Sequence, residues 1–188
     1  TEGYLAALQL RGLINDNLQW HLGGFQNDQD LRETPEGEVE NTAYQSDGIN
    51  LSLSQSGTQH SWRIGFEDFN ADSDVYVEPE GRFSPPFRDF IIDIPRRDRQ
   101  KIRADYRYSP EGNYLQSMIV DGYRQISDRQ FNTFPLMTLA PGLDLDTSIL
   151  TTSDLTTNGL NVQSDWQTGN SVSVIAGLQW LDDEINQL

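Results

Sequence analysis

Hydrophobic and polar residues alternate with a period of two along most of this chain. Leu160, Val162 and Trp166 fall on one side of their segment, opposite Asn161 and Gln163. Alternation of this kind is typical of a β-strand with one apolar and one polar face. We find no segment of comparable length with a helical period. A strand with blurred alternation is expected at 114–125, and clearer ones are centred on 4–10, 18–22, 49–54, 62–67, 102–108, 160–166 and 172–180.

Short and long connections strictly alternate between these eight predicted strands. Short ones, rich in Gly, Asn and Pro, are expected at 11–17, 55–59, 109–113 and 167–170, and long irregular ones at 27–42, 67–98 and 128–154. A soluble β-sandwich has no reason to follow this rule. Outer-membrane β-barrels do, because their periplasmic turns are short and their extracellular loops are long. The sequence therefore predicts an all-β, antiparallel transmembrane β-barrel domain over 1–188, made of four hairpins.

The charge distribution supports this interpretation. The three long stretches carry net charges of -5, -5 and -3, and the acidic tail at 182–184 adds -3, which accounts for the whole net charge of -16. The excess charge is therefore expected at one end of the strands. Within the strands, charged residues fall on the polar face, as a water-filled lumen permits, and aromatic residues fall on the apolar face, as at a lipid headgroup girdle.

Three segments resemble the central barrel of TonB-dependent outer-membrane receptors, with the strongest likeness to the heme and hemoprotein receptor branch. They read GTQHSWRIGFEDFNADSDV, DIPRRDRQKIRADYRYSPEGNYLQSMIVDGYRQISDRQF and TTNGLNVQSDWQTGNSVSVIAGLQW. The shared pattern is an arginine-rich strand, a Tyr-containing strand, a tight turn, and a strand with Tyr-x-Gln before a long loop.

The resemblance implies a 22-stranded barrel around an N-terminal plug in the outer membrane of a Gram-negative bacterium. Such receptors import heme, hemoproteins or ferric siderophores with energy delivered by TonB, in contact with the bilayer and lipopolysaccharide. No plug-like segment or TonB box is present in this sequence. We therefore expect a partial barrel of about eight strands, with both ends of the chain on the extracellular side and no cofactor of its own.

His21 and the basic cluster at 96–99 are the candidate ligand-binding residues. His21 is expected on the polar face of its strand, either as a ligand to heme or metal or as a hydrogen-bonding residue of the lumen. Arg96 and Arg97 begin the one basic island in an acidic chain. They could receive an anionic ligand or lipopolysaccharide phosphates, or they could pair with the acidic residues Asp93, Asp98 and Asp105.

Two pairs of aspartates resemble fragments of calcium-binding loops. Asp72 and Asp74 lie in FNADSDV, and Asp144 and Asp146 lie in GLDLDTS. Oxygen ligands at this spacing suit calcium, although the bidentate glutamate and the bend glycine of a complete loop are not placed. A solvated acidic loop is the alternative. Calcium titration by calorimetry separates the two, because absence of heat at millimolar calcium would exclude the site.

No other function class is indicated as strongly. With two remote histidines and no cysteine, no catalytic constellation is found, so an enzyme is not expected. The strongly negative charge excludes nucleic acid as a favoured partner. Two alternatives stay open: a self-contained eight-stranded outer-membrane barrel that acts as an anchor or adhesin, and a soluble carbohydrate-binding β-sandwich with exposed Trp and Tyr.

Overall fold

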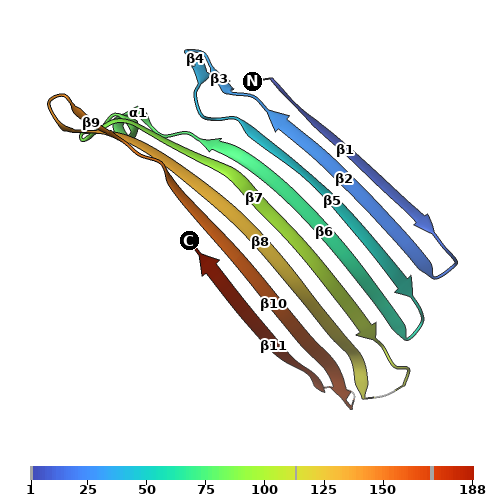
Figure 1. Ribbon diagram of the computed structural model, residues 1–188. Coiled ribbons are helices and arrows are strands. Elements are labelled where there is room, and N and C mark those ends of the chain that lie inside the picture. Colours follow the sequence, from blue (N-terminus) through green and yellow to red (C-terminus); the bar gives the residue numbers. More distant parts are fainter. Residues whose placement is uncertain (1, 113, 170–171) are drawn as a thin grey trace.

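The computed structural model describes residues 2–112, 114–169 and 172–188 and consists almost entirely of antiparallel strands. Eight long strands follow one another across one sheet in chain order (Figure 1). They are β1 (Gly3–Leu13), β2 (Leu18–Gln29), β5 (Tyr44–Ser56), β6 (His60–Val75), β7 (Phe87–Tyr108), β8 (Leu115–Ala140), β10 (Ile149–Thr168) and β11 (Val172–Gln187). The predicted number and antiparallel arrangement of the long strands are confirmed.

The short turns and the long connections lie at opposite ends of the sheet, which we call the turn end and the loop end. The loop end carries the small elements β3 (Arg32–Thr34), β4 (Gly37–Val39), α1 (Pro79–Arg82) and β9 (Leu143–Asp146) (Figure 1). Two of the predicted turns, 109–113 and 167–170, each end on a residue outside the described part of the chain. No helix among the described residues is long and apolar enough to cross a membrane.

Two of the predicted long loops are shorter than expected, because the strands reach further towards the loop end. β6 continues to Val75 and β7 begins at Phe87, so the irregular chain between them covers only 76–86. Likewise β8 continues to Ala140 and β10 begins at Ile149. These extensions contain polar and hydrophobic residues, among them Phe90, Ile91 and Phe134, but no regular alternation of the two. The backbone ladder therefore continues where the hydrophobic alternation that predicts strands has ended.

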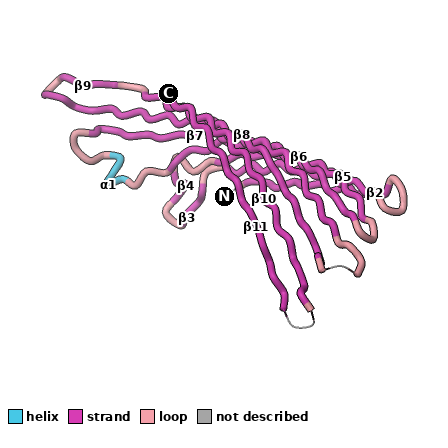
Figure 2. Tube along the Cα trace, turned by 90° about the horizontal axis from the view of Figure 1, so that it is seen from below, coloured by secondary structure: helices cyan, strands magenta, loops and turns pink. Residues whose placement is uncertain are grey.

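The sheet is a single twisted layer (Figure 2). Among the described residues, Ala71 is the one buried hydrophobic residue, while most large apolar side chains are exposed. A β-sandwich would bury one face of each sheet against the other. The described residues therefore contain no protein core of the kind that the sandwich alternative requires.

The sheet is also open. In the described part of the chain, β1 pairs only with β2 and β11 pairs only with β10, so the two edge strands do not close the sheet on itself. An eight-stranded barrel that is complete in itself would pair its first and last strands. The observed arrangement is that of a section of barrel wall.

Aromatic rings cover glycines on neighbouring strands at three places. A Cβ atom added to Gly12 would fall 2.7 Å from the indole of Trp20, and one added to Gly48 would fall 2.7 Å from the ring of Phe25. Gly159 of β10 lies beneath the ring of its register partner Tyr123 of β8. These glycines let a ring lie flat against the neighbouring backbone, which fixes the pairing of the strands.

Candidate functional site

Every long strand contributes to one apolar face and one polar face. The register shows that the predicted apolar positions lie side by side: Leu10 pairs with Leu22, Leu22 with Leu51 and Leu51 with Phe66. The opposite face carries residues such as Ser52 and Gln163. We call these the apolar face and the polar face. For the seven strands with clear alternation, the predicted division into an apolar and a polar side is confirmed.

On the apolar face, hydrophobic residues form a band of limited height. On β5 the band lies between Asp47 and Gln55, which are eight positions apart and so roughly 26 Å apart at ~3.3 Å per residue. This length along a tilted strand is comparable to the ~25 Å apolar band of outer-membrane barrels. On the loop side, the first polar or charged residues beyond the band are Gln26, Asp47, Asp68, Gln100, Arg124, Asn158 and Asp182.

The apolar band runs obliquely across the register of the sheet. The row that pairs Leu51 with Phe66 and Phe66 with Ile102 continues to Arg124 and Asn158, which lie beyond the band. A band that crosses the register obliquely is the result of strands that tilt with respect to the layer they traverse. Tilted strands of this kind are characteristic of membrane barrels.

Aromatic residues gather on the apolar face near the turn end. Trp62 lies opposite Tyr106 in the register, and its indole N–H donates a 2.9 Å hydrogen bond to Gln55. The indole N–H of Trp166 donates to the Ser164 hydroxyl at 2.8 Å. Aromatic rings whose indole N–H groups are hydrogen-bonded are typical of the lipid headgroup region, in agreement with the aromatic girdle that the sequence predicts.

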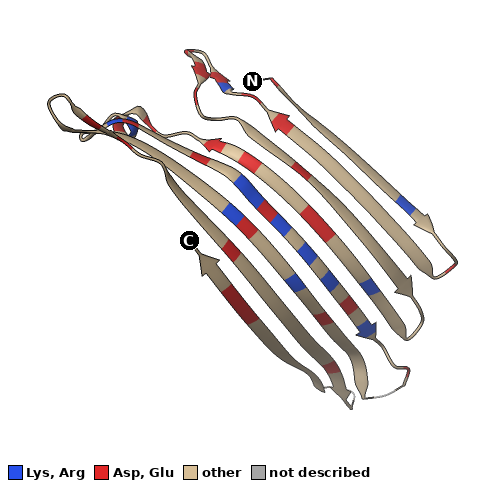
Figure 3. Cartoon of the chain, in the orientation of Figure 1, with Lys and Arg blue, Asp and Glu red and all other residues tan. Residues whose placement is uncertain are grey.

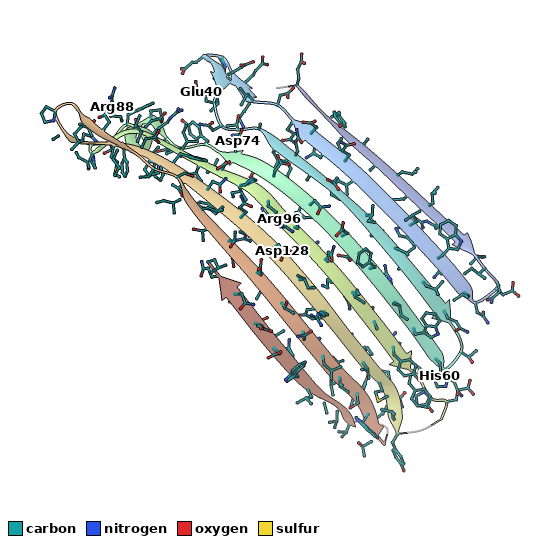
Figure 4. The ribbon with its side chains drawn as sticks, viewed as in Figure 1. Glu40, His60, Asp74, Arg88, Arg96 and Asp128 are labelled. Carbon is teal, nitrogen blue, oxygen red and sulfur yellow. The ribbon has the colours of Figure 1, made fainter. Side chains whose placement is uncertain are left out.

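His60 belongs to this aromatic group and not to a ligand site. It lies at the turn end (Figure 4), where its Nδ1 is 2.7 Å from the Tyr106 hydroxyl and its ring stacks on Tyr108. His21 lies on the polar face, where its register neighbours are Arg11 and Ser52. A facing arginine disfavours a bound cation at His21. Its role as a ligand stays a prediction.

The basic cluster is divided between the two faces, because successive residues of a strand point to opposite sides. Arg96 bonds Asp98 at 2.6 Å and Asp128 at 3.3 Å, and Figure 4 shows Arg96 and Asp128 on neighbouring strands. Arg97 projects to the other, polar face, where it lies opposite Arg129. The sequence-based alternative of paired charges therefore describes Arg96, and it does not describe Arg97.

A groove of about 710 Å³ lies on the polar face, towards the loop end of β7, β8 and β10. Arg97, Arg99 and Arg129 lie along it together with two phenylalanines, Phe69 and Phe131. The Arg99 guanidinium lies 5.7 Å from the centre of the Phe69 ring. Figure 3 shows the basic residues concentrated on β7 and β8. Sequence reasoning singled out Arg97 here, but it missed Arg129 and the two phenylalanines.

The two candidate calcium pairs lie on different elements. Asp72 and Asp74 are on β6, and the pKa of Asp72 is raised above its ordinary value, first by partial burial and then by Asp74, Asp28 and Asp47. Asp144 and Asp146 are on β9, which pairs with the end of β8. No group of three or more His, Cys, Asp or Glu side chains among the described residues is arranged to hold a metal ion. The calcium sites stay a prediction that titration can test.

Two arginines link the three long connections to one another. Arg82 of α1 bonds Glu40 of the first connection at 2.8 Å and both carboxylate oxygens of Asp89, at 2.5 and 3.3 Å. Arg88 bonds Asp144 of β9 at 2.5 Å. Glu40 and Arg88 lie at the loop end in Figure 4. We call the Glu40, Arg82 and Asp89 group the loop clamp.

The loop clamp shifts the pKa values of its members in the direction expected for ion pairs. Hydrogen bonds from Arg82 lower the pKa of Asp89, and hydrogen bonds to Asp89 and Glu40 raise the pKa of Arg82. At Asp144, the Thr138 hydroxyl is the largest cause of a lowered pKa, and Arg88 adds to it. A lowered carboxyl pKa means that ionisation of Asp89 and Asp144 stabilises the folded loops.

Breaking the loop clamp is expected to loosen the loop end. Because Arg82 is only 17% exposed, replacing it with glutamine should weaken the local structure by about 1–2 kcal/mol. Hydrogen exchange in 76–90 should quicken in Arg82→Gln and stay unchanged in Arg32→Gln, whose exposed side chain is outside the clamp. In the unaltered protein, protection should hold above the ordinary Asp pKa of 3.8 and fall as the pH drops below it. Protection that is equal in both variants would contradict the clamp.

Comparison with known proteins supports the fold. No family model and no curated protein matches the sequence. Among solved structures, the chain is similar to the copper transporter OprC, with a TM-score of 0.73 and 12% sequence identity. The match covers 97% of this chain and 28% of the OprC chain, so this chain spans little more than a quarter of that protein's length. The predicted fold class, an antiparallel portion of a transmembrane barrel, is confirmed.

Proposed function

We propose that this chain is a section of the barrel wall of a TonB-dependent outer-membrane receptor that imports a metal compound. The observation that carries the proposal is the open sheet of long strands with an oblique apolar band, whose fold matches OprC over nearly the whole chain. OprC is a copper transporter, and the sequence itself resembles the barrel of TonB-dependent receptors. In this proposal, the apolar face meets lipid, the polar face meets the barrel lumen, and the loop end is extracellular.

The open edges of the sheet support a larger barrel. An unpaired strand edge in lipid would leave backbone N–H and C=O groups without partners, at a cost of several kcal/mol each. Further strands must therefore cover β1 and β11 within the membrane. A barrel that is complete with these eight strands, which is the anchor or adhesin alternative, is disfavoured by the same argument.

We further propose that the imported solute is an iron compound. It is either a ferric siderophore or heme, which is taken up free or from a hemoprotein. The sequence resemblance to heme receptors supports it, and OprC shows that copper is the cargo of at least one protein with this fold. We propose transport and not catalysis, with a plug domain and TonB as partners. In receptors of this kind, the wall holds the loops and lines the path of the solute while the plug moves.

Uptake measurements test this function. Cells that lack the protein are compared with complemented cells, each with and without TonB, for uptake of heme, ferric siderophores and copper. We expect uptake of an iron compound that requires both the protein and TonB. Copper uptake with the same double requirement would keep the receptor and correct its cargo. Uptake of all three that is unaffected by loss of the protein would overturn the proposal.

A further inference from the structure

We infer that Arg97 and Arg129 form an anion-binding site on the polar face, for a small solute that carries carboxylate or phosphate groups. The inference rests on the proposed function only in assigning the polar face to a water-filled lumen. The two residues are register partners on β7 and β8. The Cβ atoms of residues opposite each other in this way are about 5 Å apart, so the two guanidinium groups can reach one bound group.

In the part of the chain that the structure describes, these two arginines lack a carboxylate partner, unlike Arg96 and Arg103 of β7. Among the described residues, Arg97 and Arg129 have no ion-pair partner, whereas Arg96 is held by Asp98 and Asp128, and Arg103 is held by Asp105 at 2.6 Å. Like charges directly opposite each other in a sheet are destabilising. A bound anion would relieve that repulsion.

The acidic residues nearest to the arginine pair form ion pairs with other arginines. Asp98 and Asp128 border the same groove, but Arg96 binds both of their carboxylates on the apolar side of the sheet. Arg99, on the polar face, lies 3.8 Å from Glu67 and borders the groove as well. Three guanidinium groups therefore line the groove, and among the described residues only that of Arg99 has a carboxylate partner, the more distant Glu67.

The rest of the groove suits an organic anion. Phe69 and Phe131 contribute apolar surface, and Gln125, Ser127 and Ser153 contribute neutral polar groups. The volume of about 710 Å³ lies within the range of small-molecule sites, roughly 300–1,000 Å³. Arginine binds planar carboxylates and phosphates through two parallel hydrogen bonds, so a solute with two or more such groups could engage Arg97 and Arg129 together.

Calorimetry on the full-length protein, purified from the outer membrane in detergent, tests the site with citrate and inorganic pyrophosphate as separate probes in metal-free buffer. We expect at least one probe to bind, and the Arg97→Gln/Arg129→Gln variant to bind it at least about tenfold more weakly, since two charge-assisted contacts are lost. The matched control is Arg103→Gln, on the same face of β7 but paired with Asp105, which should bind as the unaltered protein does. Preference for citrate or pyrophosphate identifies carboxylate or phosphate as the recognised group.

A thermal melt gives a second readout. The preferred probe should raise the melting temperature of the unaltered protein and of Arg103→Gln equally, and should raise that of Arg129→Gln, a milder variant that removes one half of the like-charge pair, by less. No heat with either probe at about 10 mM, or equal affinity in the double variant, would overturn the inference. Because neither measurement requires TonB, binding without any uptake in cells would count against the proposed function alone.

Discussion

Replacing Val162 with arginine is expected to destabilise the protein by about 2–4 kcal/mol, the cost measured for a cation near the middle of the lipid face of a barrel. Val162 lies on the apolar face of β10, and its register partners are Val120 and Leu178. An arginine there has no water and no carboxylate opposite it. Reversible unfolding by urea in lipid vesicles measures the change.

The adjacent residue provides a matched control. Gln163 lies one position further along β10 and therefore on the polar face, opposite Ile119 and Gly177. Gln163→Arg inserts the same side chain into the same strand, but on the side that faces a watery lumen, so the free energy of unfolding should change by less than about 1 kcal/mol. Equal losses in the two variants would contradict the assignment of the faces.

Replacing Gly159 with alanine is the second change expected to have a large effect, a loss of about 1–3 kcal/mol. The ring of Tyr123 lies over Gly159, well inside van der Waals contact of the position that a Cβ atom would take. The nearest atoms are Cε1, Cζ and Cδ1 of the ring, so the whole ring has to swing away from the glycine. Moving it also disturbs the Lys101 ammonium, which lies 4.8 Å from its centre.

Gly122 is the control for this substitution. It is register partner to Leu160, next to Gly159 on the same strand pair, and a Cβ atom there would meet nothing nearer than 3.5 Å. Gly122→Ala should leave stability unchanged or raise it by about 0.5–1 kcal/mol, since alanine restricts the unfolded chain. Unfolding of both variants under one set of conditions gives the comparison. A Gly159→Ala protein as stable as Gly122→Ala would show that the ring is free to move.

The strands could be predicted from the sequence within the apolar band and not beyond it. Inside the band, lipid on one side and water on the other impose alternation, as in Leu160 and Val162 opposite Asn161. Beyond it, as in 89–94 or 131–139, polar and hydrophobic residues occur without regular alternation, so the sequence does not mark the strand. The alternation of β8 is blurred because Gly122 and Arg124 lie on its apolar side while Ile119 and Tyr123 lie on its polar side.

The candidate site could be predicted only in part, because it depends on register. Arg97 is noticeable as a basic residue in an acidic chain, but Arg129 is separated from it by a turn and about half of each of two strands. Local sequence does not fix which residues of two long strands face each other. The same limit applies to the ring of Tyr123 over Gly159.

Spin labels along β10 test most directly whether one face of this sheet meets lipid. The sequence has no cysteine, so single cysteines at 160–165 of the full-length protein, with any other cysteines removed, can carry a nitroxide. In lipid vesicles, labels at 160, 162 and 164 should collide more often with oxygen, and labels at 161, 163 and 165 with a water-soluble nickel chelate. Accessibility to the two reagents that does not alternate, or that alternates in the opposite sense, would contradict a membrane-spanning barrel wall with its polar face towards the lumen.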